Sequence, residues 1–273
     1  MEKAGFSAKA EIFLSCATER HTIKELVLNE HALFIMLSGE SKIVHADQTY
    51  VFRAGDIILC PRNQVARVTK CPAEGQPCRS ISIVFTQSFL QKYYAAHPAV
   101  PSPPVDTPRI RTYGPHPLLE SLLSSLLPYF TLSGELPADL AAIKVQEAIT
   151  VLRAIDKEVD SILGNFEKPG KIDLASFMER NYMFNMSLER FGFLTGRSLT
   201  TFKRDFKKAF NTNPQTWLKQ KRLETAYYEI FEKKRKPIDV YFEVGFENLS
   251  HFSFAFKQKY GLSPKQLAKA HAG

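Results

Sequence analysis

Cysteine is scarce in this sequence, with four residues among 273: Cys16, Cys60, Cys71 and Cys78. None of the four stands in the C-x-x-C spacing that is typical of a structural zinc site. We therefore expect reduced thiols in a cytoplasmic protein, because disulfides persist mainly in oxidising compartments. One alternative stays open, since Cys71 and Cys78 share a loop with proline and glycine and could form a redox pair.

Long apolar runs are also missing. No stretch is apolar over the roughly 20 residues that a membrane-spanning helix needs. The N-terminus, Met1–Gly5, is followed by mixed polar sequence and not by the apolar core of a signal peptide. These absences predict a protein that has no membrane partner.

The residues that are present suffice for two domains. Of the 273 residues 44% are hydrophobic and 23% are charged, as in ordinary globular proteins. Residues 171–273 hold 19 Lys and Arg against 10 Asp and Glu, a net charge of +9, whereas residues 1–170 hold 17 against 18. A basic surface can neutralise the phosphates of a nucleic acid, although by itself it is equally compatible with a solvated basic face.

The basic third of the chain repeats one pattern. Residues 198–214 (SLTTFKRDFKKAFNTNP) and 248–264 (NLSHFSFAFKQKYGLSP) have identical spacing. Each copy begins with a polar residue that can cap a helix and ends at a proline, which cannot continue one. Between them, aromatic residues at i, i+4 and i+8 form a stripe that we interpret as core and not as a base-stacking platform: Phe202, Phe206, Phe210, Phe252, Phe256 and Tyr260.

A shorter predicted helix and a glycine turn precede each copy. Ser187 can cap a helix over 188–194, and Pro237 can open a second over 238–244. A helix, a tight turn and a second helix make the helix-turn-helix plan, in which the second helix can enter the major groove of DNA. Asp173 can cap a further helix over 174–182, and a helix over 217–231 joins the two units.

The run from Gly245 to Pro264, together with Arg222-Leu223-x-x-Ala226, resembles the signature of AraC/XylS-type transcriptional regulators. The resemblance covers about the last hundred residues. It implies a bacterial activator or repressor that binds double-stranded DNA through two helix-turn-helix units, with RNA polymerase as a partner if the protein is an activator.

Helical geometry and this resemblance together predict the DNA contacts. Six residues face away from the aromatic stripes and are expected to face the bases: Thr200, Lys203, Arg204, Leu249, Ser250 and Phe254. Eight are better placed for the DNA backbone: Ser198, Thr201, Lys207, Lys208, Asn248, His251, Ser253 and Lys257. Phe254 stands where the family commonly has arginine. Because phenylalanine can touch a thymine methyl but cannot bind guanine, we expect less discrimination from the second unit.

The N-terminal part is predicted to consist of short strands. Between about residues 9 and 86, turn signals separate candidate strands at 24–29, 31–37, 41–45, 49–52, 57–60, 65–69 and 79–85. Their order, with Gly39, Gly55-Asp56 and Pro61 between them, resembles the cupin-type jelly roll of many AraC-type regulators. The expected fold is therefore α+β with two domains: a cupin-like β-barrel over 1–97 and an all-α domain over 173–273, joined through a linker at 164–172.

The sequence departs from cupin enzymes in its metal ligands. Such enzymes use a His-x-His pair, a Glu and a further His, whereas His21, His31 and His45 are isolated here. We expect no metal, no cofactor and no catalytic residues, but an interior that could hold an effector. Four basic residues are weak candidates for contacting an acidic effector: Lys24, Arg53, Arg62 and Arg67.

The segment 98–163 connects the two predicted domains. Seven prolines between Pro98 and Pro117 predict an extended surface segment. A helix over 118–127 should end at Pro128, and a second should run from Pro137 to about Ile162, with an apolar side made of Leu140, Ile143, Ala148, Leu152, Ile155 and Val159. By the family resemblance we expect this hairpin, 118–162, to form a homodimer contact. The alternative is that its apolar side packs on the barrel.

Three functional interpretations remain open at this stage. The first is a sequence-specific regulator whose N-terminal domain senses a small effector and dimerises. In the second, the barrel binds a regulatory partner protein. In the third, a metal-free enzyme domain is fused to a DNA-binding module, but the sequence has no recognisable nucleophile and base.

Overall fold

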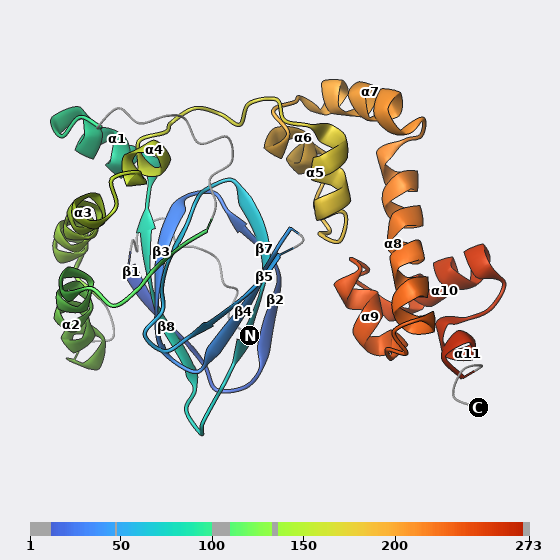
Figure 1. Cartoon of the computed structure of the whole chain (residues 1–273), viewed down its shortest axis with the longest axis horizontal. Coiled ribbons are helices and arrows are strands. Elements are labelled where there is room, and N and C mark those ends of the chain that lie inside the picture. The colour runs from blue at the N-terminus through green and yellow to red at the C-terminus, as the bar shows by residue number, and fades with distance from the viewer. Residues whose placement is uncertain (1–11, 47, 100–109, 133–135, 270–273) are drawn as a thin grey trace. The chain divides into compact units, whose positions relative to one another are not determined.

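The computed structural model describes residues 12–46, 48–99, 110–132 and 136–269 (Figure 1). The chain divides into two compact units, residues 1–167 and residues 168–273. The first is built mainly of strands with helices beside them, and the second is entirely helical in its described part. The predicted α+β class with two domains is therefore confirmed.

Two antiparallel sheets form the first unit. The five-stranded sheet has the order β1 (Ile12–Ala17), β8 (Cys78–Phe85), β3 (His31–Ser38), β6 (Ile57–Cys60) and β9 (Arg111–Tyr113). The four-stranded sheet has the order β2 (His21–Leu28), β7 (Gln64–Cys71), β4 (Glu40–His45) and β5 (Gln48–Arg53). Each of the seven strands named from the sequence is present, with ends that differ by up to three residues.

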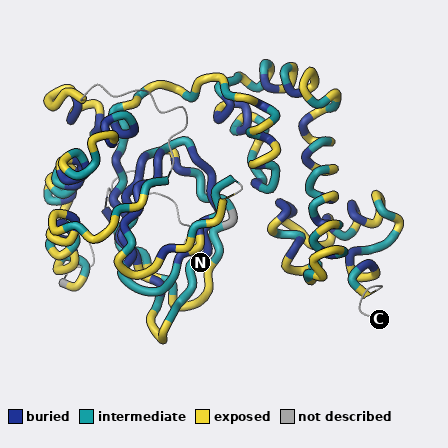
Figure 2. The backbone as a smooth tube through the Cα atoms, in the orientation of Figure 1, coloured by how far each residue is buried: buried dark blue, intermediate teal, exposed yellow. Residues whose placement is uncertain are grey.

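Side-chain alternation in the five-stranded sheet supplies two cores. Phe34 and Met36 of β3 point to the space between the sheets, where they meet residues of the four-stranded sheet such as Val68. Leu33 and Ile35 point to the opposite face, which the helices cover. The strand β3 is therefore apolar on both sides, and Figure 2 shows it largely buried.

The turn between β3 and β4 requires glycine. Gly39 has a φ of +74°, a conformation that disfavours every residue with a side chain. A Cβ at this position would also lie 2.5 Å from the Cα of Cys78. The backbone of this turn is thus packed directly against the start of β8.

Four helices pack on the outer face of the five-stranded sheet (Figure 1). They are α1 (Gln87–Ala96), α2 (Pro117–Leu132), α3 (Ala138–Ile155) and α4 (Val159–Leu163). Their buried residues join those of the sheet in one cluster, which includes Leu119, Leu122, Leu126, Val145, Ala148, Ile149 and Leu152. The predicted hairpin therefore exists as α2 and α3, and much of its apolar side packs on the sheet.

Several expectations for residues 87–163 were wrong. The helix α1 and the short edge strand β9 were not predicted, and Ile143 is 60% exposed instead of buried. The helix α2 continues through Pro128, whose missing N–H deprives only the carbonyl of the exposed Ser124 of its helical donor, a bond that water can replace. Gly134 and residues 100–109, half of the proline-rich segment, lie outside the described residues.

The helix expected to reach Ile162 is in fact two helices. α3 ends at Ile155, because Asp156 adopts an extended backbone, and α4 begins at Val159. The Asp156 carboxylate accepts bonds from Arg111 Nη1 at 2.9 Å and from the Tyr113 hydroxyl at 2.9 Å. This contact links the break to the edge strand β9, which lies far away in the sequence.

In its described part, up to residue 269, the second unit contains seven helices: α5 (Leu174–Asn181), α6 (Leu188–Leu194), α7 (Leu199–Phe210), α8 (Pro214–Phe231), α9 (Pro237–Glu243), α10 (Leu249–Tyr260) and α11 (Pro264–Lys269). They build two separate cores, and α8 contributes to both, through Leu218 to the first and through Leu223, Ala226 and Ile230 to the second. Each copy of the repeat therefore folds around its own apolar centre.

The interpretation of the aromatic stripes as core is confirmed. Phe202, Phe206, Phe252 and Phe256 are fully buried, and Phe210 and Tyr260 are partly buried. Neighbouring rings of each copy lie against one another, with centroids 4.4 Å apart in the stacked pair Phe206 and Phe210 and 4.7 Å apart in the tilted pair Phe256 and Tyr260. None of these rings is free to stack on a base.

The described residues offer neither a membrane-spanning helix nor a metal site. No helix in the described ranges combines the length and the apolar character needed to cross a bilayer. Within the same ranges, no group of three His, Cys, Asp or Glu side chains is arranged to hold a metal ion. The four cysteines are free thiols.

Candidate nucleic-acid interface

The first helix-turn-helix unit consists of α6 and α7. Ser187 caps α6 by accepting a hydrogen bond from Arg190 N at 3.2 Å, and Ser198 caps α7 by accepting one from Thr201 N at 3.3 Å. Between them Gly196 has a φ of +67°, and a Cβ there would overlap the carbonyl of Gly170. Both predicted caps and the glycine turn are confirmed. Together they fix the direction of α7 relative to α6.

The polar face of α7 carries the predicted contacts of the first unit. Thr200, Lys203 and Arg204 are exposed opposite the buried Phe202 and Phe206. Of the predicted backbone contacts, Ser198, Lys207 and Lys208 are exposed and Thr201 is half-buried. The helix thus presents a polar and basic surface to solvent.

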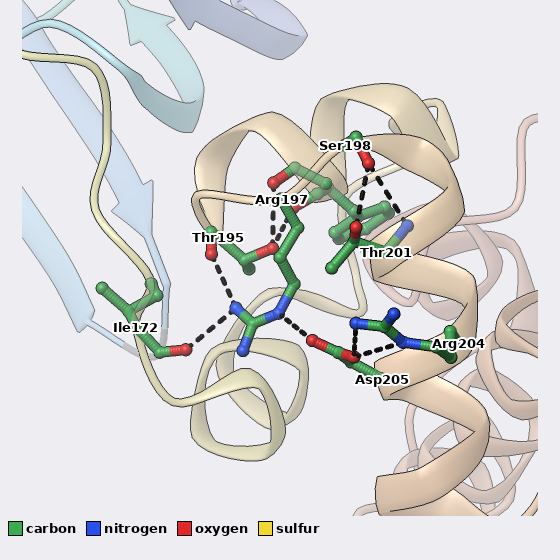
Figure 3. Close-up of polar contacts among 9 residues, drawn as sticks. Ile172, Thr195, Arg197, Ser198, Thr201, Arg204 and Asp205 are labelled. Carbon is green, nitrogen blue, oxygen red and sulfur yellow. Dashed lines mark hydrogen bonds and ion pairs between the residues drawn. The ribbon is translucent and has the colours of Figure 1, made fainter.

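Two residues that the sequence analysis did not name organise this face (Figure 3). Arg197 donates from Nη1 to the carbonyls of Ile172 at 3.0 Å and Thr195 at 2.6 Å, and from Nε to Asp205 Oδ2 at 3.1 Å. The other carboxylate oxygen, Oδ1, accepts from Arg204 Nε at 3.3 Å and Nη2 at 3.1 Å. The hydrogen bond from Arg197 is the main reason that the pKa of Asp205 lies below its ordinary value.

The second helix-turn-helix unit consists of α9 and α10. Asn248 caps α10 by accepting hydrogen bonds from Ser250 N at 2.7 Å and His251 N at 3.2 Å. The predicted contacts of this unit are exposed, except that Ser253 is half-buried. Two of them are apolar, since Leu249 is 37% and Phe254 is 69% exposed. The second face is therefore far less polar than the first.

Arg222 of α8 links the two helix-turn-helix units. Its Nε donates to the carbonyl of Tyr182 at 2.8 Å and its Nη2 to the carbonyl of Phe184 at 2.9 Å. A Cβ at Gly245, in the turn before α10, would approach this guanidinium to 2.8 Å. The Arg222 side chain is thus held between the C-terminal end of α5 and the glycine turn that precedes α10.

The basic side chains of residues 168–273 differ in whether they form ion pairs with carboxylates. Arg235 is bound to Glu229 and Glu243, and Lys259 to Glu224. The predicted contacts Lys207, Lys208 and Lys257 have no ion-pair partner among the residues that the structure describes. Their charge is available to phosphates.

A cavity of about 1060 Å³ lies in the first unit between the two sheets. Its walls include Phe34, Met36 and Ile58. Of the Lys and Arg residues that line it, Arg20 is exposed, whereas Lys70 is half-buried and hydrogen-bonded to the hydroxyl of Ser15. This volume is at the upper end of the range for small-molecule sites. Lys70 was not predicted, because the strand pattern of the sequence does not reveal which residues face the cavity.

Of the basic residues predicted from the sequence to contact an effector, Arg53, Arg62 and Arg67 do not line this cavity. Arg53 pairs with Glu40 at 3.1 Å on the surface. Arg62 donates to the carbonyls of Asn165 at 2.9 Å and Glu167 at 2.7 Å, and Arg67 is buried. The side chain of Lys24 is outside the described part.

The isolated histidines have structural surroundings. His31 is buried, which lowers its pKa to about 3, and its Nδ1 accepts a hydrogen bond from the Arg62 backbone N–H at 3.1 Å. His45 Nδ1 lies 3.0 Å from the carbonyl of Val65 and donates to it. His21 lies at the wall of the cavity.

Comparison with known proteins gave matches over both units. A family model described as a helix-turn-helix domain matches residues 194–270, and one described as the ExsA N-terminal regulatory domain matches residues 31–160. The HTH-type transcriptional regulator ExsA of Pseudomonas aeruginosa is 25% identical over 255 residues, which cover 92% of this chain and 91% of that protein. The virulence regulon transcriptional activator VirF of Yersinia enterocolitica is 24% identical over 245 residues, 87% of this chain and 89% of its own.

Among solved structures, a single-residue variant of apo ToxT from Vibrio cholerae aligns with a TM-score of 0.48 at 10% identity, covering 94% of this chain and 96% of that one. The two family models match different units, so that together they account for both the strand-rich and the helical part. The relatives are regulators and not enzymes, as expected from the sequence. With its doubled helix-turn-helix, the chain belongs to the AraC family of DNA-binding transcriptional regulators.

Proposed function

We propose that this regulator recognises a specific DNA sequence by inserting α7 and α10 into two successive segments of the major groove. The observation that carries this proposal is the exposure of all six predicted base-facing residues on two N-capped helices of one compact unit. Residues near the N-terminus of a groove-bound helix reach base edges, and flanking lysines reach phosphates. DNA in the cytoplasm is the expected partner.

The two units are proposed to differ in what they read. Lys203 and Arg204 can hydrogen-bond guanine, whereas Leu249 and Phe254 can contact only apolar groups such as the thymine methyl. The first unit therefore supplies most of the hydrogen-bonded discrimination. Backbone contacts in both units fix the register of the protein on the duplex.

We further propose that the N-terminal unit regulates this binding by holding an effector between its two sheets. The cavity supports this, because it is large, mainly apolar in its walls and provided with one inner ammonium group, Lys70. An apolar molecule with an anionic end fits these walls. Arg53, Arg62 and Arg67 are not part of this proposal, since none of them lines the cavity.

Self-association through the helices α2 and α3 is the second proposed role of this unit. Leu118, Leu127 and Ile143 remain exposed on these helices, whereas most of their other apolar residues pack on the sheet. A contiguous exposed apolar patch is typical of an interface, and we propose that these three residues belong to one. A homodimer would place two DNA-binding units on one operator. A partner protein seated on the same residues is the competing occupant.

The matches favour an activator, because VirF is described as one. An activator acts by contact with RNA polymerase, which is therefore the proposed protein partner at the promoter. We propose no cofactor, because neither the regulation nor the DNA binding described above requires one.

Binding to fragments of the source genome across a salt series tests these proposals. The full chain and residues 168–273, which contain both helical cores, should select the same fragments, and affinity should fall steeply with salt. Selection by the full chain alone would mean that self-association is essential. If neither preferred any fragment over bulk DNA, with or without a metabolite mixture, sequence-specific recognition would be rejected.

A further inference from the structure

Asp205 of α7 sits between two arginines. One carboxylate oxygen accepts from Arg197 Nε at 3.1 Å, and the other accepts from both Nε and Nη2 of Arg204 at 3.3 and 3.1 Å (Figure 3). We propose that Asp205 is a positioning residue that aims Arg204 at guanine. This inference rests on the proposed base contact of Arg204.

The geometry leaves the useful edge of Arg204 free. A guanidinium carries five N–H donors in a rigid planar fork. The carboxylate of Asp205 occupies the edge formed by Nε and one hydrogen of Nη2. The remaining edge, formed by Nη1 and Nη2, is the one that binds O6 and N7 of guanine with two parallel hydrogen bonds.

The carboxylate is itself held in place. Arg197 has a side chain that is only 11% exposed, and it is anchored on the carbonyls of Ile172 and Thr195. Along the chain of contacts, side-chain exposure rises to 25% at Asp205 and 73% at Arg204. The buried Arg197 thus orients the exposed Arg204 through Asp205. Arg204 then loses less rotamer freedom when it binds DNA.

The second copy of the repeat provides an internal comparison. Fifty residues downstream, Glu247 replaces Arg197, Ala255 replaces Asp205 and Phe254 replaces Arg204. Where the reading arginine is absent, both members of its support are absent too. The second copy thus lacks the whole set of three side chains, as expected if the carboxylate serves the arginine.

A carboxylate facing DNA also carries a cost. It repels the phosphates and thus weakens binding to every sequence alike. A positioning role therefore predicts effects of opposite sign when the charge is removed: weaker discrimination, but equal or tighter binding to non-specific DNA. A purely structural role predicts weaker binding to both.

The test uses full-length protein and the tightest-binding fragment from the genomic screen. Dissociation constants are measured for this fragment, for every single base-pair substitution in its bound region, and for non-specific DNA. Asp205→Asn, Arg204→Ala and the double variant are compared, with Asp239→Asn as the matched loss of one exposed negative charge elsewhere in the same unit.

Asp205→Asn should lower the preference for guanine at one base pair by about fivefold to tenfold, while affinity for non-specific DNA stays equal or rises. Arg204→Ala should abolish the preference at that same pair, and in its background Asp205→Asn should have no further effect on discrimination. Asp239→Asn should leave discrimination intact. Because each preference is a ratio of two constants from one preparation, partial unfolding of a variant does not alter it.

Two results would overturn the inference in distinguishable ways. If Arg204→Ala removes a preference that Asp205→Asn leaves unchanged, the positioning role is wrong and the base contact stands. If Arg204→Ala changes no preference at any base pair, the proposed contact itself is wrong, and the positioning role is rejected with it.

Discussion

Phe254 is the residue at which the two recognition helices differ most. It is 69% exposed on α10, at the position that corresponds to Arg204 of α7. Phe254→Arg should create a preference for guanine at one base pair of the second segment, at the lower end of the roughly 1–3 kcal/mol of a bidentate contact, because Ala255 offers no carboxylate to position the arginine. Ile238→Arg on α9, also exposed, adds the same charge outside the predicted base contacts.

Binding constants for single-base-pair variants of the operator would measure both effects. Tighter binding to all DNA by both variants is expected from the added charge. An unchanged base preference of Phe254→Arg would show that this position does not face the bases.

The glycine turn of the first unit allows a separate prediction about stability. Gly196 and Gly261 both have positive φ, but a Cβ at Gly196 would overlap the backbone of Gly170, whereas none of the described atoms lies within 4 Å at Gly261. Gly261→Ala should cost about 1–2 kcal/mol from backbone strain alone. Gly196→Ala should cost clearly more, because the chain before α5 must move as well.

Urea unfolding of residues 168–273 would compare these two variants. Equal losses of unfolding free energy would mean that the approach of Gly196 to Gly170 is relieved at no cost.

At the scale of helices and strands, the hairpin of α2 and α3 combines a packed side with an exposed one. Ile143 is 60% exposed, so Ile143→Glu should leave the unfolding free energy within about 0.5 kcal/mol of the parent. If the hairpin is the dimer contact, the same change should shift the protein towards monomer in sedimentation. Ile238→Glu on α9 serves as the control, and a dimer that persists in Ile143→Glu would exclude this part of the hairpin from the interface.

Local patterns predicted the elements whose cause is local. The caps Ser187, Ser198 and Asn248 and the aromatic stripes depend on residues within three or eight positions, so the sequence sufficed for them. The break after Ile155 depends on Asp156 meeting Arg111 and Tyr113 more than forty residues away, and no periodicity reveals such a contact.

The site was predictable to the same degree. Helical spacing identified which residues of α7 and α10 are exposed, because the buried aromatics define the opposite face. It did not identify the bond from Arg197 to Asp205, since nothing in an eight-residue spacing fixes how two side chains meet across a turn. Lys70 was missed because the sequence of a strand does not show which of its sides faces the space between the two sheets.

For the whole molecule, the uneven charge predicts how binding depends on salt. Each neutralised phosphate contributes about 0.9 to the slope of log K against log salt. Replacing Lys207 and Lys208 by glutamine should therefore reduce the slope by about 1.8. Replacing Lys233 and Lys234, which are exposed but outside the predicted contacts, should leave it unchanged. Equal slopes in the two double variants would contradict the assignment of α7 as the phosphate-binding helix.

The clasp of Arg222 on the carbonyls of Tyr182 and Phe184 has a consequence for the operator. A base pair inserted between two recognised segments moves the second by about 3.4 Å and turns it by about 35° around the duplex axis. Two units on a loose tether could follow that rotation, but two units clasped to one helix cannot. Torsional phase between the segments therefore becomes part of what the protein reads, and only twisting or bending of the DNA can compensate for an insertion.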